Sequence, residues 1–149
     1  VRELLEGYVQ DNFVHLGFAP EDYFRLTDLQ VAAVGWLAQH QHFTALSAKL
    51  GGRIGSLDAD VLTDQPEAAI AAVAAHFDLT LDAAEIANGP AFRRNSKNGS
   101  SYSPAARSAD YAAARTAYGE EIAMVVTWAG AVANNVGLTL DGPNPLLQA

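Results

Sequence analysis

The chain has 149 residues, half of them hydrophobic, so it can bury the core of one domain, and the absence of cysteine excludes disulfides, thiolate metal sites and a catalytic thiol. A formal net charge of −8 excludes nucleic acid and anionic membranes as general partners. No apolar run approaches the ~20 residues that span a bilayer, and no secretory leader opens the sequence, so the predicted location is the cytoplasm.

Two helices are predicted in the first third of the chain. Apolar residues at three- and four-residue steps predict the first helix over Arg2 to Leu16. Thr27 and Gln30 then form a capping-box pattern, in which each side chain satisfies a backbone N–H group at the start of a helix. Gly51 provides the stop. The second helix is therefore predicted from near Asp28 to about Leu50.

One strand and two further helical segments are predicted in the middle of the chain. Arg53 to Asp58 alternates larger apolar with polar residues between glycines, which predicts a short strand. Pro66 suits the first turn of a helix, where its missing N–H group costs nothing, and this helix is predicted to reach about Phe77. A helical turn from Asp82 to Ala87 ends at the breaker Asn88-Gly89-Pro90.

A polar loop from Ala91 to Ser103 is predicted to lead into the longest helix. Ser103-Pro104 has the cap-then-proline form of a helix start, and helical spacing of apolar residues continues to Gly137. Gly119 is expected to weaken or bend the middle of this helix, at a cost of roughly 1 kcal/mol relative to alanine.

Together these elements predict a mostly α chain with about one short β-strand. The tail from Asp141 to Leu147 is too rich in proline to be helical. Residues 1–149 are expected to form a single domain or part of one.

The sequence contains no complete active site. The mononucleotide loop GxxxxGK[S/T], the dinucleotide loop GxGxxG and the serine elbow GxSxG are all absent, so no phosphate cradle is encoded. His40 and His42 lie roughly 200° apart around a predicted helix and do not converge on a metal ion. His15 and His76 stand beside apolar residues, where a hydrogen-bonded structural histidine is the expected outcome.

A basic cluster lies in the stretch that separates Glu85 from Asp110 and contains no acidic residue. Its members are Arg93, Arg94, Lys97 and Arg107. The same loop holds Ser96 and the turn-forming pair Asn98-Gly99, just ahead of a helix N-terminus. Guanidinium groups, backbone N–H groups and the helix dipole together favour a phosphate or sulfate. Two interpretations stay open: an anion site, or a solvated loop that balances acidic helices elsewhere.

Several passages of the chain resemble P-loop sulfotransferases. The passage from Arg53 to Leu79 is similar to the family segment in which a strand leads through an acidic-Leu-x-x-x-Pro turn into a helix ending Phe-Leu-Gly-Leu. The helix with Trp36 looks like the family helix that precedes that strand. Asn95-Ser-Lys-Asn, a long helix with Trp128 and a closing Pro-Leu-Leu are similar to the end of bacterial members. The resemblance covers residues 27–147.

This resemblance implies the C-terminal part of a three-layer α/β fold. Enzymes of this family transfer a sulfuryl group from 3′-phosphoadenosine 5′-phosphosulfate (PAPS) to a hydroxyl or amine, without a metal. Their phosphosulfate loop and usual base precede the region covered here, so no catalytic residue is assigned and the chain is expected to be inactive alone. The partners implied are the nucleotide and a small-molecule acceptor, when the N-terminal half is present.

The resemblance also implies candidate contacts to the nucleotide. A later loop of the family, often Arg-Lys-Gly-x-x-Gly-Asp-Trp, falls near Phe92 to Ser100, where this chain lacks the Gly-Asp-Trp end. By that correspondence the candidate contacts to the 3′-phosphate are Arg93, Arg94 and Lys97, with Ser96 as a weaker one.

A different class of function stays open beside the sulfotransferase interpretation. The chain is alternatively a small helical protein-interaction or regulatory module without catalysis, in which apolar helix faces pair with a partner or with a second copy. Specific nucleotide binding at Arg93 and Arg94 would separate the two interpretations, whereas self-association fits both.

Overall fold

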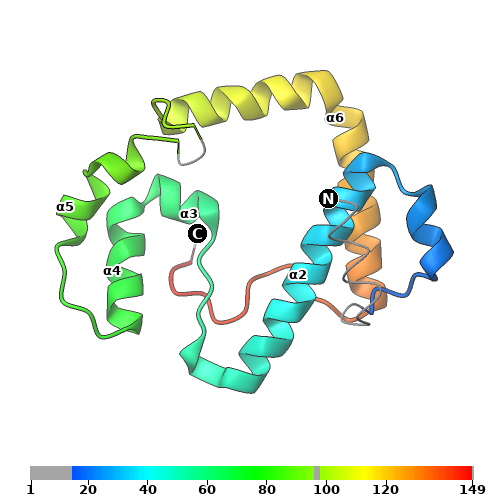
Figure 1. Ribbon diagram of the computed structural model, residues 1–149, viewed down its shortest axis with the longest axis horizontal. Coiled ribbons are helices and arrows are strands. Elements are labelled where there is room, and N and C mark those ends of the chain that lie inside the picture. The colour runs from blue at the N-terminus through cyan, green and yellow to red at the C-terminus, as the bar shows by residue number, and fades with distance from the viewer. Residues whose placement is uncertain (1–14, 96–97, 149) are drawn as a thin grey trace. The chain divides into compact units, whose positions relative to one another are not determined.

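The structure, a computed structural model, describes residues 15–95 and 98–148, which fall into two compact units. Unit 1 comprises the described part of Val1–Gly51 together with Tyr118–Gly142. Unit 2 comprises the described part of Gly52–Ala117 and of Pro143–Ala149. Helices dominate both units, and the described residues form no sheet (Figure 1). The prediction of a mostly α chain is confirmed.

The elements follow one another with short connections. In chain order they are η1 (Pro20–Arg25), α2 (Asp28–Leu50), η2 (Gly51–Arg53), α3 (Ala59–Asp64), α4 (Pro66–His76), α5 (Ala83–Ala87), η3 (Pro90–Phe92) and α6 (Pro104–Asn135). The helix predicted over Arg2 to Leu16 lies outside the described residues except for its last two positions, which are not helical. None of the helices in the described ranges has both the length and the apolar character needed to cross a bilayer.

Local hydrogen bonds account for both ends of α2. The backbone N–H of Thr27 donates to Oε1 of Gln30 at 2.9 Å, and the N–H of Gln30 donates back to the threonine hydroxyl at 3.3 Å. At the other end Gly51 has φ 59°, and its N–H donates to the carbonyl of Ser47. The predicted capping box and the predicted bounds of this helix are therefore confirmed.

The core of unit 1 lies between α2 and the C-terminal part of α6, which run side by side in Figure 1. Its buried members are Leu16, Val31, Val34, Leu37, Val132, Ala133 and Leu138. Phe18 adds an aromatic contact, since its ring stacks on Trp128 at 5.7 Å and meets the edge of Tyr23 at 5.6 Å. Burial, with a smaller contribution from Asp22, raises the pKa of the Tyr23 phenol, which therefore stays neutral at physiological pH.

A kink interrupts α6 next to the glycine in its middle. Tyr118 has φ −134° and ψ 18°, outside the helical region, and Gly119 follows directly. Glycine weakens a helix because it has no side chain to limit the unfolded backbone. The predicted bend is thus confirmed. Past the end of the helix, Gly137 has φ 67° and the N–H of Leu138 donates to the carbonyl of Ala133 at 2.9 Å.

The predicted strand from Arg53 to Asp58 is replaced by a single bridge to the tail. The N–H of Ser56 donates to the carbonyl of Asn144 at 3.1 Å, and the N–H of Leu146 donates to the carbonyl of Ser56 at 2.9 Å. This is one parallel bridge between Ser56 and Pro145, so the strand prediction was too long. Its partner lies about 90 residues away in the sequence, where local patterns give no information.

A short helix, α3, follows that segment and was missed by the sequence analysis. Its cap is Asp58, whose carboxylate accepts the N–H groups of Asp60 at 2.7 Å and Val61 at 3.3 Å. Gln65, with φ −129° and ψ 55°, separates α3 from α4 without a glycine. The predicted helix from Pro66 and the predicted helical turn from Asp82 to Ala87 are confirmed as α4 and α5, and the Asp82 side chain caps α5.

The contact between Gly55 and the tail predicts a site where a single methyl group is destabilising. A Cβ atom on Gly55 would lie 2.6 Å from Cγ of Leu146, which is too close. We expect Gly55→Ala to lower the free energy of unfolding by about 1–3 kcal/mol, because the Leu146 side chain must move from its packed position.

Urea denaturation followed by circular dichroism measures this change. Gly52→Ala is the matched control, because a Cβ at Gly52 meets nothing within 4 Å. Equal losses of stability in the two variants would contradict the assigned contact with Leu146.

Candidate anion-binding site

The predicted polar loop forms a short hairpin between η3 and α6. The N–H of Tyr102 donates to the carbonyl of Arg93 at 2.9 Å, and the N–H of Asn95 donates to the carbonyl of Ser100 at 2.8 Å. These bonds flank the antiparallel bridge between Arg94 and Ser101. In such a pair, which itself makes no backbone hydrogen bonds, the two side chains lie close on one face. Arg94 and Ser101 are therefore paired on the same face of the hairpin.

The basic hairpin comprises residues 93–95 and 98–102. Asn98 and Gly99 shape its tip. The Asn98 side chain accepts hydrogen bonds from the N–H of Ser100 at 3.0 Å and from its hydroxyl at 2.7 Å. Gly99 has φ 70°, and its N–H donates to the carbonyl of Asn95 at 2.8 Å. The left-handed turn predicted here is confirmed at Gly99. Local hydrogen bonds thus hold the described part of the hairpin in shape.

Arg93 and Arg94 present uncompensated positive charge on this hairpin. Both residues are exposed, and neither guanidinium has a hydrogen bond or an ion pair with the residues that the structure describes. The other two predicted contacts, Ser96 and Lys97, lie outside the described residues. An arginine fork that is not already engaged can bind a phosphate or sulfate through two parallel hydrogen bonds.

The serines of the loop, which looked alike in the sequence, have different roles. The Ser100 hydroxyl is engaged by Asn98, and the Ser103 hydroxyl accepts the N–H of Ala106 at 3.2 Å, which caps α6. Ser101 is the serine paired with Arg94 across the bridge. Sequence reasoning missed this distinction because it depends on the pairing register of the hairpin.

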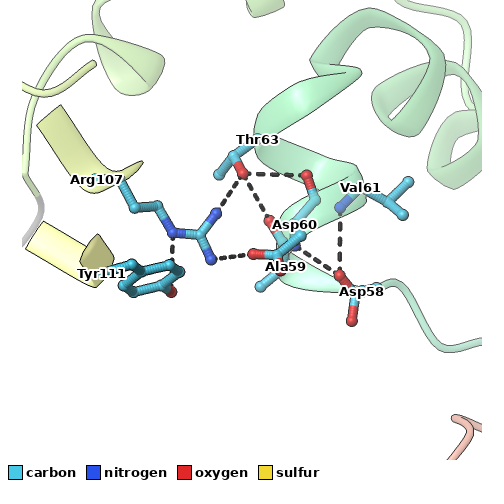
Figure 2. Close-up of polar contacts among 7 residues, drawn as sticks. All are labelled: Asp58, Ala59, Asp60, Val61, Thr63, Arg107 and Tyr111. Atoms are coloured by element: carbon cyan, nitrogen blue, oxygen red, sulfur yellow. Dashed lines mark hydrogen bonds and ion pairs between the residues drawn. The ribbon is translucent and has the colours of Figure 1, made fainter. Parts of the chain in front are cut away.

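Arg107 has side-chain partners of its own. Its Nε–H donates to the Tyr111 hydroxyl at 3.0 Å and Nη1 donates to Oγ1 of Thr63 at 2.6 Å, while Nη2 forms an ion pair with Asp60 (Figure 2). The hydrogen bond to Tyr111 raises the pKa of the guanidinium, which is charged at all physiological pH values. Of the four basic residues that cluster in the sequence, Arg107 is therefore one that already has an acidic partner, Asp60.

Two histidines, His40 and His76, take part in structural contacts through their rings. Nε2 of His40 donates to the carbonyl of Thr139 at 2.8 Å, and its ring stacks on Trp36 at 5.0 Å. Nε2 of His76 donates to the carbonyl of Arg53 at 3.4 Å, so the predicted structural role of this histidine is confirmed. Across residues 15–95 and 98–148, no three His, Cys, Asp or Glu side chains lie close enough together to hold a metal ion.

The described part of the hairpin carries groups suited to binding an anion. The guanidinium groups of Arg93 and Arg94 can each hold and orient a phosphate or sulfate through paired N–H donors. Comparisons of the chain with protein-family models, curated proteins and solved structures found no match. The candidate site therefore rests on its residues and their geometry.

Proposed function

We propose that the chain is the C-terminal part of a sulfotransferase-like protein, and that its basic hairpin contacts the 3′-phosphate of PAPS. The observation that carries the proposal is the pair of exposed guanidinium groups at Arg93 and Arg94, which have no acidic partner among the described residues. They stand on a hairpin that leads directly into a capped helix, so cations and a helix N-terminus occur together.

The charge and chemistry of the hairpin fit this nucleotide. A 3′-phosphate carries close to two negative charges at neutral pH and offers three acceptor oxygens, which arginine forks match in geometry. The Ser101 hydroxyl, opposite Arg94, is a further donor for such an oxygen. When bound, PAPS supplies the sulfuryl group, and the residues of this chain would hold the far end of the molecule. Reaction chemistry would depend on a phosphosulfate loop and a base outside these 149 residues.

The order of elements is a second support for the proposal. An extended segment leads into α3, a proline opens α4, and the basic hairpin precedes a long helix that carries Trp128. This is the order in which the resembling sulfotransferase passages occur.

Calorimetric titration of the complete polypeptide that contains this chain tests the proposal. We expect 3′-phosphoadenosine 5′-phosphate to bind at least about tenfold more tightly than adenosine 5′-monophosphate, which lacks the 3′-phosphate, because one charge-assisted contact is worth about 1.5–3 kcal/mol. Equal affinity for the two nucleotides, or binding of neither, would count against a 3′-phosphate site.

A non-catalytic interaction module is the second candidate function, and exposed apolar side chains favour it. Around the turn from α4 to α5, Phe77 is 61% exposed and Leu79 is 56% exposed, and Leu81 and Ile86 are exposed beside them. Such neighbouring apolar groups are typical of a surface that pairs with another chain. The test is analytical ultracentrifugation of the wild type and of Phe77→Ser. A dimer lost in the variant, without nucleotide binding by the wild type, would favour the module.

A further inference from the structure

Arg107 connects two elements that are far apart in the sequence. It is the fourth residue of α6, and its side chain reaches Asp60 and Thr63 on α3, 47 and 44 residues away (Figure 2). α3 and the part of α6 that ends at Ala117 both belong to unit 2. The side-chain hydrogen bonds recorded between α3 and α6 within the described ranges all involve this guanidinium.

The guanidinium has little freedom to move. Its Nε, Nη1 and Nη2 atoms each have a different partner, and its carbon lies 5.0 Å from the centre of the Tyr111 ring. The Thr63 hydroxyl, which accepts from Nη1 of Arg107, is itself hydrogen-bonded to α3. It donates to the Ala59 carbonyl at 3.0 Å and to the Asp60 carbonyl at 3.1 Å (Figure 2). These hydrogen bonds join the start of α6 to α3.

The basic hairpin is continuous with that anchored turn. The N–H of Arg107 donates to the Ser103 carbonyl at 3.2 Å, and the Ser103 hydroxyl accepts the N–H of Ala106. One residue earlier, the N–H of Tyr102 donates to the Arg93 carbonyl. Backbone hydrogen bonds therefore link the Arg107 anchor to the strand that carries Arg93 and Arg94.

The exposed ion pair in this cluster adds little to global stability. Asp60 is 66% exposed, and ion pairs in water are screened and offset by lost side-chain entropy. The contacts of Arg107 with Asp60, Thr63 and Tyr111 therefore matter mainly for the position of α6 relative to α3. That position sets where the base of the hairpin lies, and binding sites lose affinity when charged donors are displaced by a fraction of an ångström.

We propose that Arg107 is a positioning residue, which holds the start of α6 on α3 and so fixes the direction from which Arg93 and Arg94 meet a bound phosphate. This inference rests on the proposed function, because the ligand is the 3′-phosphate nucleotide assigned there. Three of the five N–H donors of Arg107 are engaged by protein side chains, so the role proposed for it is indirect, through the position of α6.

Binding of 3′-phosphoadenosine 5′-phosphate to variants of the complete polypeptide tests this role. Arg107→Ala is expected to lower the affinity about tenfold, and Arg107→Lys nearly as much, because lysine keeps the charge but loses the planar fork. Thr63→Val should also weaken binding several-fold although it removes no charge. Arg115→Ala is the matched control, since it removes the same charge from an exposed position on α6 and should leave the affinity unchanged.

Wild-type affinity in Thr63→Val, or an equal loss in Arg115→Ala, would overturn the positioning role, because charge alone would then explain the data. Amide hydrogen exchange provides a readout that needs no ligand. The N–H groups of Asn95, Gly99 and Tyr102 should exchange several-fold faster in Arg107→Ala and Thr63→Val but not in Arg115→Ala. If the wild type binds no nucleotide yet exchange changes in this way, the proposed function fails and the anchor stands. Unchanged exchange overturns the anchor.

Discussion

Replacing Arg93 and Arg94 together by alanine is expected to lower the affinity of the complete polypeptide for 3′-phosphoadenosine 5′-phosphate by about 100-fold or more. Each exposed guanidinium can make charge-assisted hydrogen bonds worth about 1.5–3 kcal/mol, and neither has a described protein partner that would replace them. The effect is large because the net charge of −8 repels an anion everywhere else. Isothermal titration calorimetry at fixed ionic strength measures the change.

Two controls separate specific recognition of the 3′-phosphate from a general attraction between opposite charges. The double lysine variant of Arg93 and Arg94 keeps both charges but loses the forks, so its affinity should fall between those of the wild type and the alanine variant. Affinity for adenosine 5′-monophosphate should change far less than affinity for the 3′-phosphate nucleotide. Unchanged binding of the 3′-phosphate nucleotide by the alanine variant would place the site elsewhere.

Leu37→Ala is expected to produce the largest loss of stability from one substitution. The Leu37 side chain is 0% exposed and lies in the core between α2 and α6, so truncation removes buried methyl groups and leaves a cavity. Substitutions of this kind cost about 2–5 kcal/mol, a large part of the total stability of a small domain.

Denaturation of unit 1 by urea, followed through its tryptophan fluorescence, measures the free energy of unfolding. Leu46→Ala is the matched control, because Leu46 lies on the same helix but is 36% exposed, and its loss should be about 1 kcal/mol or less. A Leu37→Ala variant that is as stable as the control would contradict the assigned core.

Features that depend on a few neighbouring residues were predictable from the sequence. The capping box of Thr27 and Gln30, the proline at the start of α4 and the bend next to Gly119 all act within one or two helical turns. Their hydrogen bonds and backbone preferences exist before any tertiary contact forms, so pattern and structure agree.

Features that depend on distant partners were not predictable in the same way. The pattern from Arg53 to Asp58 is typical of a strand, yet this segment forms a single bridge, between Ser56 and Pro145 of the tail. Asp58 was assigned to the end of that strand, which hid its role as the cap of α3. An aspartate two to three residues ahead of an amphipathic stretch was the available signal.

In the candidate site, too, features set by neighbouring residues were predictable, and features set by distant partners were not. The exposed cations at Arg93 and Arg94 follow from composition alone, whereas the ion pair of Arg107 depends on Asp60, 47 residues earlier in the chain. A sequence segment without acidic residues does not reveal an acidic partner on another helix. The position of Ser101 opposite Arg94 likewise needs the register of the hairpin.

The most direct test of the central claim is the in-frame translation of the coding DNA immediately upstream of the Val1 codon. A C-terminal part of a sulfotransferase-like protein predicts an uninterrupted frame that encodes a strand followed by a phosphate loop rich in Gly, Ser and Arg. A stop codon close upstream, together with a credible start at Val1, would contradict the claim and make a helical interaction module the leading account.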